Sequence, residues 1–213
     1  MMKHISDIKE ENMKFLKVAV LSLSVLLSAC ASYDMQQAMR PDNRNIYPKL
    51  PNMEPIFEAG KSSSTDSGTP ATASVQLNNE FATYFRREVE RNLIDEVGPI
   101  KGKLVLEPIF VKRDYNMAWR FPNILIVPML LGCPMTSYTT EWELELNVLD
   151  KNGQRIKRYS AEVENTEYEA LYWGYKDGIE ALRAATFEGY KKALDDIIKQ
   201  LQADIPMLSA KLK

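Results

Sequence analysis

Histidine is almost absent from this 213-residue chain. The single histidine, His4, lies in an N-terminal stretch that we expect to be removed. Without a further histidine, Ser-His-Asp and Cys-His catalysis and histidine-ligated zinc sites are excluded from the mature chain. The chain also lacks the glycine-rich motifs that hold nucleotides and the G-x-S-x-G nucleophile motif. We therefore predict no enzyme activity, no cofactor and no metal centre; catalysis by carboxylates alone is the one enzymatic chemistry left.

An excess of charge of either sign is also missing, because 27 basic residues stand against 29 acidic ones. Such a chain has no overall field that would gather nucleic acid. Its 45% hydrophobic and 26% charged residues are typical of a globular protein.

Long hydrophobic runs are lacking too. The main apolar run is short and covers only residues 18–27. A bilayer-spanning helix needs about 20 apolar residues, so this run is too short to be one. Lys14 and Lys17 precede it and small residues follow, which is the pattern of a secretory signal. We predict a signal peptide over residues 1–29. Because three acidic residues within residues 1–12 are unusual in a signal, we expect the true start at Met13.

The end of this run, Leu27-Ser28-Ala29-Cys30, resembles the lipobox of bacterial lipoproteins. The resemblance implies that cleavage precedes Cys30 and that its sulfur carries a fatty acyl anchor. Residue 31 is alanine and not aspartate, which in such lipoproteins implies the outer membrane. Acylation of Cys30 leaves Cys133 as the only free thiol, so no internal disulfide can form.

Residues 30–76 are rich in proline in their first half and in serine, threonine and glycine in their second half. Such a composition buries too little apolar surface to offset the entropy of the chain. We predict a lipidated flexible tether. As an alternative, residues 47–50 or 56–57 dock on the domain as an edge segment.

Strict alternation of apolar and polar residues predicts a strand over residues 136–150. Asn152-Gly153 predicts a tight turn, and residues 154–164 return as the partner strand. A two-residue turn makes the numbers of paired residues sum to 305. The expected pairs are Leu146 with Tyr159, Leu144 with Ala161 and Trp142 with Val163. Another strand is predicted at residues 103–112, where Pro108 indicates a bulge or an edge position.

Helical periodicity appears twice. Apolar residues at every fourth position from Phe81 to Val97 predict a helix that Gly98-Pro99 ends. A longer helix is predicted from residue 177 to about 202, with its stripe starting at Ile179 and Pro206 ending it. The expected fold is a single α+β domain over residues 77–206, with a tail at 207–213. It consists of an antiparallel sheet of three to five strands with two amphipathic helices packed on one face.

Four carboxylates on the polar side of the predicted hairpin form the first candidate site. The register places Glu143 opposite Glu162 and Glu141 opposite Glu164. Like charges directly opposite one another destabilise a sheet, so a bound cation is one interpretation. The alternative is that these side chains point into water or pair with Lys103 or Lys112.

Residues 121–135 form an apolar stretch that three prolines interrupt. One interpretation is a core strand followed by a covered loop. The other is an exposed surface that contacts an envelope protein, a sister subunit or the lipid surface. The residues of this contact would be Trp119, Phe121, Ile126, Met129, Leu130 and Leu131. The aromatic segment at residues 172–175 suggests either a ligand platform or a cap on the core.

Taken together, the lipobox, the Pro128-x-x-x-Gly132-x-Pro134 stretch, the strand at 141–150 with its turn, and the helix at 193–201 resemble small envelope lipoproteins. These are proteins related to the curli-secretion-channel lipoprotein and to the N-terminal domain of TolB. The resemblance implies a non-enzymatic component of export or assembly, often an oligomer. We predict a lipid-anchored binding or assembly module on the outer membrane, facing the periplasm. The alternative is a periplasmic lipoprotein that binds a ligand or a cation.

Overall fold

The computed structural model describes residues 33–44, 46–58, 63–66, 75–116, 133–170, 176 and 178–212. The predicted signal peptide and lipobox lie outside the described residues. So do the apolar contact residues Trp119, Phe121, Ile126, Met129, Leu130 and Leu131, and the aromatic segment 172–175. Within the described residues, no helix has the length and apolar character needed to cross a membrane.

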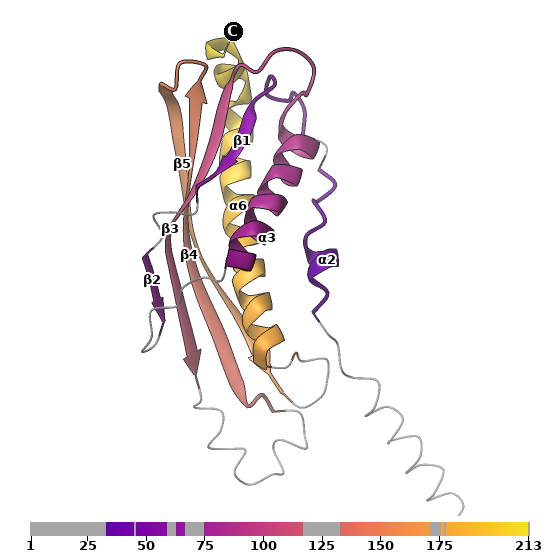
Figure 1. The fold of residues 1–213 in the computed structure, drawn as a ribbon, viewed down its shortest axis with the longest axis vertical. Coiled ribbons are helices and arrows are strands. Elements are labelled where there is room, and N and C mark those ends of the chain that lie inside the picture. Colours follow the sequence, from indigo (N-terminus) through magenta and orange to yellow (C-terminus); the bar gives the residue numbers. More distant parts are fainter. Residues whose placement is uncertain are drawn as a thin grey trace, which may run out of the picture.

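Three long strands make up most of a sheet that has five strands in the described part of the chain (Figure 1). They are β3 (Gly102–Asn116), β4 (Thr136–Asp150) and β5 (Arg155–Glu169), and each pairs antiparallel with the next. Two short strands, β1 (Glu54–Phe57) and β2 (Ser63–Asp66), pair with successive parts of β3 in parallel. The predicted α+β class is thus confirmed, and the parallel edge is an addition to it.

The register of the β4–β5 hairpin agrees with the one that the sequence predicts. Trp142 pairs with Val163, Leu144 with Ala161, Leu146 with Tyr159, Glu141 with Glu164 and Glu143 with Glu162.

The turn of this hairpin differs from the prediction. Its loop has three residues, 151–153, because the Asp150 N–H donates to the Gln154 carbonyl at 2.9 Å. Gly153 takes the left-handed conformation (φ 79°) that such a loop requires. An irregularity at Ile156 then restores the register, so the two departures cancel. In β3, the register shift after Pro108 is the bulge predicted there.

Two helices cover one face of the sheet. The first is α3 (Val75–Glu88), continued by the π-helical turn η1 (Val89–Leu93), and the second is α6 (Gly178–Lys211). They bury an aromatic core against the apolar side of β4. The buried aromatic members of this core include Phe81, Tyr84, Phe85, Trp142, Phe187 and Tyr190.

The helix boundaries depart from the prediction at both ends. The first helix ends at Leu93, because the next residue, Ile94, becomes extended and pairs with Leu50; Val97 is 83% exposed. Ile179 is 76% exposed, because it lies in the first turn of α6, before the buried stripe begins at Ala181.

The second helix continues beyond Pro206, which was predicted to end it. Pro206 is exposed, whereas Ile205 and Leu208 beside it are buried. Packing of this last turn on the core therefore outweighs the one backbone hydrogen bond that proline cannot donate. Residues 207–211 are helical, and Leu212 is buried, so this part of the predicted tail belongs to the domain.

Residues 33–44 and 46–58 pack on the domain, so the prediction of a flexible tether is wrong for this segment. It contains the short helix α2 (Met35–Ala38) and strand β1, and it buries Leu50 and Met53 in the core. The docking alternative for residues 47–50 and 56–57 is the one observed. We call residues 33–58 the strap. Ile46, Leu50 and Met53 are its buried members of the core, whereas Tyr47 is exposed.

Candidate functional site

One end of the domain gathers the ends of β3 and β5 and the starts of β4 and α6 (Figure 1). Strand β3 ends there at Asn116, which pairs with Ser137 near the start of β4. Strand β5 ends at Glu169, whose carboxylate accepts a hydrogen bond from the Tyr138 hydroxyl at 2.9 Å. Helix α6 begins beside them, since a Cβ on Gly178 would lie 2.9 Å from that same hydroxyl.

Tyr33, the first described residue, joins the same end. Its backbone N–H donates to Glu180 and its hydroxyl donates to Glu188, both at 3.0 Å. The ammonium group of Lys176 lies 5.6 Å from the centre of its ring. Burial, and then the neighbouring charge of Glu188, raise the pKa of the Tyr33 hydroxyl above its ordinary value. We call this part of the molecule the Tyr33 end.

A cavity of about 370 Å³ opens beside this tyrosine. It is lined by Tyr33, Asp34, Gln37, Ala38, Lys176, Glu188 and Lys191. Lys176 pairs with Glu167 at 2.9 Å and Lys191 with Glu188 at 3.8 Å. The lining is mixed in charge, and its two cations are already matched by carboxylates of the domain.

The described residues that flank the apolar stretch and the aromatic segment lie at the Tyr33 end. The apolar stretch leaves the described chain after Asn116 and returns at Cys133, and Met135 donates a backbone hydrogen bond to Glu169 at 2.7 Å. The aromatic segment is flanked by Ala170 and by Lys176, which forms a bridge with Glu169. Two segments that the sequence singled out separately thus begin and end at one place.

The carboxylates of the predicted cation site occupy the expected face but are not assembled around an empty centre. Lys112 lies between two carboxylates, at 2.8 Å from Glu141 and 2.7 Å from Asp114. These hydrogen bonds raise the pKa of the Lys112 ammonium group. Glu143, Glu162 and Glu164 are exposed to water. Among the described residues, no group of three or more possible ligands is placed to hold a metal ion. The lysine alternative is thus the one observed at Glu141.

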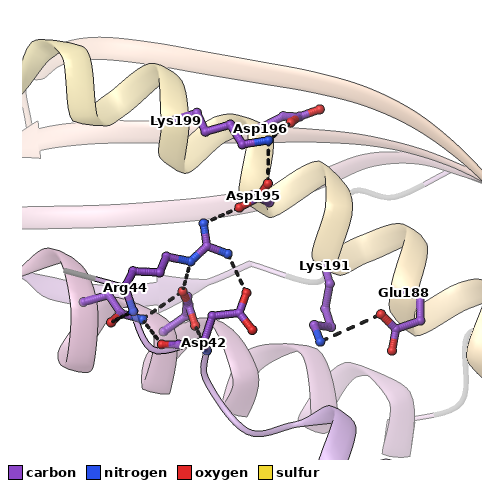
Figure 2. Close-up of polar contacts among 9 residues, drawn as sticks. Asp42, Arg44, Glu188, Lys191, Asp195, Asp196 and Lys199 are labelled. Carbon is purple, nitrogen blue, oxygen red and sulfur yellow. Dashed lines mark hydrogen bonds and ion pairs between the residues drawn. The ribbon is translucent and has the colours of Figure 1, made fainter. Parts of the chain in front are cut away.

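A buried polar cluster between the strap and the two helices escaped the sequence analysis. At its centre the guanidinium group of Arg44 lies 2.9 Å from Glu88, whose side chain is 1% exposed. The same guanidinium group binds Asp195 of α6 and, at 2.8 Å, Asp42 (Figure 2). Asn92 donates to Glu88 at 2.9 Å and to the Asp42 carbonyl at 2.8 Å.

The electrostatics of this cluster indicate a structural role. Burial raises the pKa of Glu88 above its usual range, and the nearby Arg44 opposes that shift. The pKa of Asp195 is lowered: hydrogen bonds from Lys199 and Arg44 favour its charged form and outweigh its partial burial. The signal in the sequence was that Glu88 and Asn92 occupy buried positions of a helix whose neighbours at Phe85 and Val89 are apolar. Such buried polar residues require partners, which here come from the strap.

Comparison with known proteins adds little to these observations. No protein-family model and no curated protein match the chain. A candidate lipoprotein from Caulobacter crescentus CB15 matches at 16% identity and a TM-score of 0.31, over 70% of this chain and 90% of that one. A DUF330-family protein from Xanthomonas campestris matches at 12% identity and a TM-score of 0.35, over 76% of this chain and 88% of that one. A minor lipoprotein from Acinetobacter baumannii matches at 11% identity and a TM-score of 0.32, over 76% of this chain and 94% of that one. Likeness at such low TM-scores carries no argument about this chain.

Proposed function

We propose that this protein is a non-enzymatic lipoprotein of the bacterial outer membrane, held by acyl groups on Cys30 and facing the periplasm. Its domain acts there as a binding or assembly module for another envelope component. The proposal joins the signal-like N-terminus and the lipobox residues Leu27 to Cys30 to a domain that begins almost directly after them.

The observation that carries the proposal is the fixed position of Tyr33. Its two hydrogen bonds to α6 hold the chain only three residues after Cys30. Three extended residues span roughly 10 Å at most. An acyl anchor at Cys30 would therefore keep the Tyr33 end close to the membrane surface, with the rest of the domain projecting away from it.

The contact surface in this proposal is the apolar stretch at residues 121–135, together with Trp119. Asn116 before it and Cys133 near its end lie at the Tyr33 end, so a partner bound there would be held beside the membrane. Apolar surfaces of this kind commonly mark protein or membrane contacts.

Membrane fractionation tests the anchor. Full-length protein and a Cys30→Ala variant are expressed in a bacterium that processes lipoproteins, and membranes are washed with high salt. We expect the wild type to stay in the washed membranes and the variant to lose its processing and its stable attachment. A variant that is cleaved normally and stays attached would contradict the proposal.

Cross-linking tests the contact surface separately. Leu130→Ser and Leu131→Ser in one variant should abolish cross-links from residues 119–131 to an envelope protein or a second copy, with unchanged thermal unfolding. A Val97→Ser variant serves as the control, because Val97 is exposed elsewhere. Loss of folded protein in the double variant would show that the stretch is core instead.

A further inference from the structure

Six large apolar or aromatic side chains are strongly exposed among the described residues, and three of them lie at the Tyr33 end. These three are Tyr115, 46% exposed, Tyr168, 40% exposed, and Ile179, 76% exposed. Tyr115 stacks on Tyr138, with ring centres 6.2 Å apart. Tyr168 pairs with Ser137 in the neighbouring strand.

Ile179 is placed at this end by its neighbours in the first turn of α6. Gly178 lies against Tyr138 and Glu169, and Glu180 accepts the hydrogen bond from Tyr33. The three exposed side chains therefore come from the end of β3, the end of β5 and the start of α6, at the end of the domain that holds Tyr33. Tyr115 and Tyr168 lie on opposite faces of the sheet there, because Tyr115 pairs with Tyr138 and Tyr168 with Ser137. We call these three residues the end patch.

The carboxylates around the end patch are matched within the domain. Asp114 pairs with Lys112, Glu167 pairs with Lys176, and Glu169 accepts from Tyr138. Glu180 accepts from the backbone of Tyr33. Because Asp114 and Glu167 are paired with lysines, these two carboxylates oppose the approach of a lipid headgroup less than unpaired carboxylates would.

Exposed apolar side chains also occur at the opposite end, where Val97 and Ile100 lie shortly before β3 begins. The 15 residues of β3 separate the two ends by about 45 Å. Exposure alone does not tell the ends apart. The length of chain before Tyr33 does, because a lipid on Cys30 can reach only one of them.

We infer that the end patch, Tyr115, Tyr168 and Ile179, rests on the lipid surface in which Cys30 is anchored. The inference rests on the proposed acylation of Cys30. Tyrosine is favoured at such interfaces because its ring is apolar and its hydroxyl stays hydrated. The domain is thus oriented on the membrane, with its long axis upright and the Val97 end directed away.

Fluorescence quenching by labelled lipid tests this orientation. Single-cysteine variants Tyr115→Cys, Tyr168→Cys and Ile179→Cys are made in a Cys133→Ser chain and purified from membranes as lipoproteins. They are labelled with an environment-sensitive dye and reconstituted into vesicles of phosphatidylethanolamine and phosphatidylglycerol. A phospholipid that carries a nitroxide near its headgroup is the quencher. Val97→Cys and Ile100→Cys are the matched controls, since both are exposed and apolar.

We expect the quencher to lower emission about twofold at each folded end-patch position and to leave both controls nearly unchanged, given their roughly 45 Å greater height. Equal quenching at both ends, or none at the end patch, would overturn the inference. Flotation with the vesicles and the mass of the Cys30 peptide are measured on the same samples. A protein that is acylated and floats but shows no end-patch quenching refutes the orientation alone, whereas an unacylated protein refutes the proposed function as well. Thermal unfolding identifies the folded variants, and the three positions give independent readings.

Discussion

The indole ring of Trp142 lies directly against Gly189, in the space that a side chain at residue 189 would occupy. A Cβ on Gly189 would be 2.8 Å from Cδ1 of the indole. The indole N–H donates to the Thr186 carbonyl at 2.8 Å, one turn earlier in the same helix. Strand β4 and helix α6 are thus in close contact where glycine meets tryptophan.

Gly189→Ala should therefore lower the free energy of unfolding, by about 1–3 kcal/mol. In an exposed helix the same substitution would raise it, because alanine favours helix over glycine by roughly 1 kcal/mol. Urea unfolding of both proteins measures the difference.

A double-mutant cycle isolates the contact. In a Trp142→Phe chain the smaller ring leaves room for a methyl group at residue 189, so Gly189→Ala should cost about 1 kcal/mol less there. Equal costs in the two chains would show that the indole is not what restricts residue 189.

The stability of the protein should depend on pH through Glu88. Burial raises the pKa of Glu88 in the folded state above the ordinary carboxyl value of about 4.3. At pH values between these two pKa values, Glu88 is protonated in the folded chain and ionised in the unfolded chain. The contribution of Glu88 to the free energy of unfolding is therefore complete below the ordinary carboxyl pKa. It is lost as pH rises towards the raised pKa of the folded state. Glu88→Gln removes this slope, so the variant should gain stability relative to wild type as pH rises from about 4.

Wild type and the Glu88→Gln variant share all other titrating groups, including Asp195. The contributions of those groups to the pH dependence of stability cancel in the difference between the two chains. Urea unfolding at several pH values gives the difference curve. A difference that stays constant with pH, or one of opposite slope, would contradict the raised pKa of Glu88.

The Arg44 side of the cluster makes a separate prediction. Arg44→Met leaves the Glu88 carboxylate buried without its main counter-charge, which should cost on the order of 3–5 kcal/mol near pH 7. Adding Glu88→Gln should recover part of that loss, because no charge then remains buried. Failure of the second substitution to recover any stability would show that the pair does not act as an ion pair.

The strap should be essential for stability. Leu50 is fully buried, so Leu50→Ala should lower the free energy of unfolding by about 2–5 kcal/mol. Tyr47→Ala is the matched control, because Tyr47 lies three residues away and is 93% exposed; its effect should stay within about 0.5 kcal/mol. Thermal and urea unfolding measure both variants. If Leu50→Ala lowered the free energy of unfolding as little as Tyr47→Ala, the segment would be a tether after all.

Local patterns predicted the sheet well because they are strong there. The alternation in residues 136–150 and the Asn152-Gly153 turn defined β4 and its pairing with β5, including the opposed glutamates. The register survived an error in the loop length, because the buried face of Trp142, Leu144 and Leu146 fixes it independently of the turn.

The strap could not be predicted in the same way. Residues 33–58 have four prolines and no periodicity, and their order comes from contacts distant in sequence, such as Arg44 with Glu88 and Leu50 with Ile94. Likewise, the sequence indicated a lipid anchor and an apolar contact stretch, but only the fold brings Tyr33 to the end where that stretch departs and returns. Tertiary packing of this kind leaves no local trace in composition.

The central claim is that an acylated cysteine directly precedes a domain that is fixed close to the membrane. Mass spectrometry of the N-terminal peptide, from full-length protein expressed in a lipoprotein-processing bacterium, tests it most directly. We expect a chain that starts at residue 30 and carries fatty acyl groups there. An N-terminus elsewhere, or residue 30 with an unmodified thiol, would contradict it.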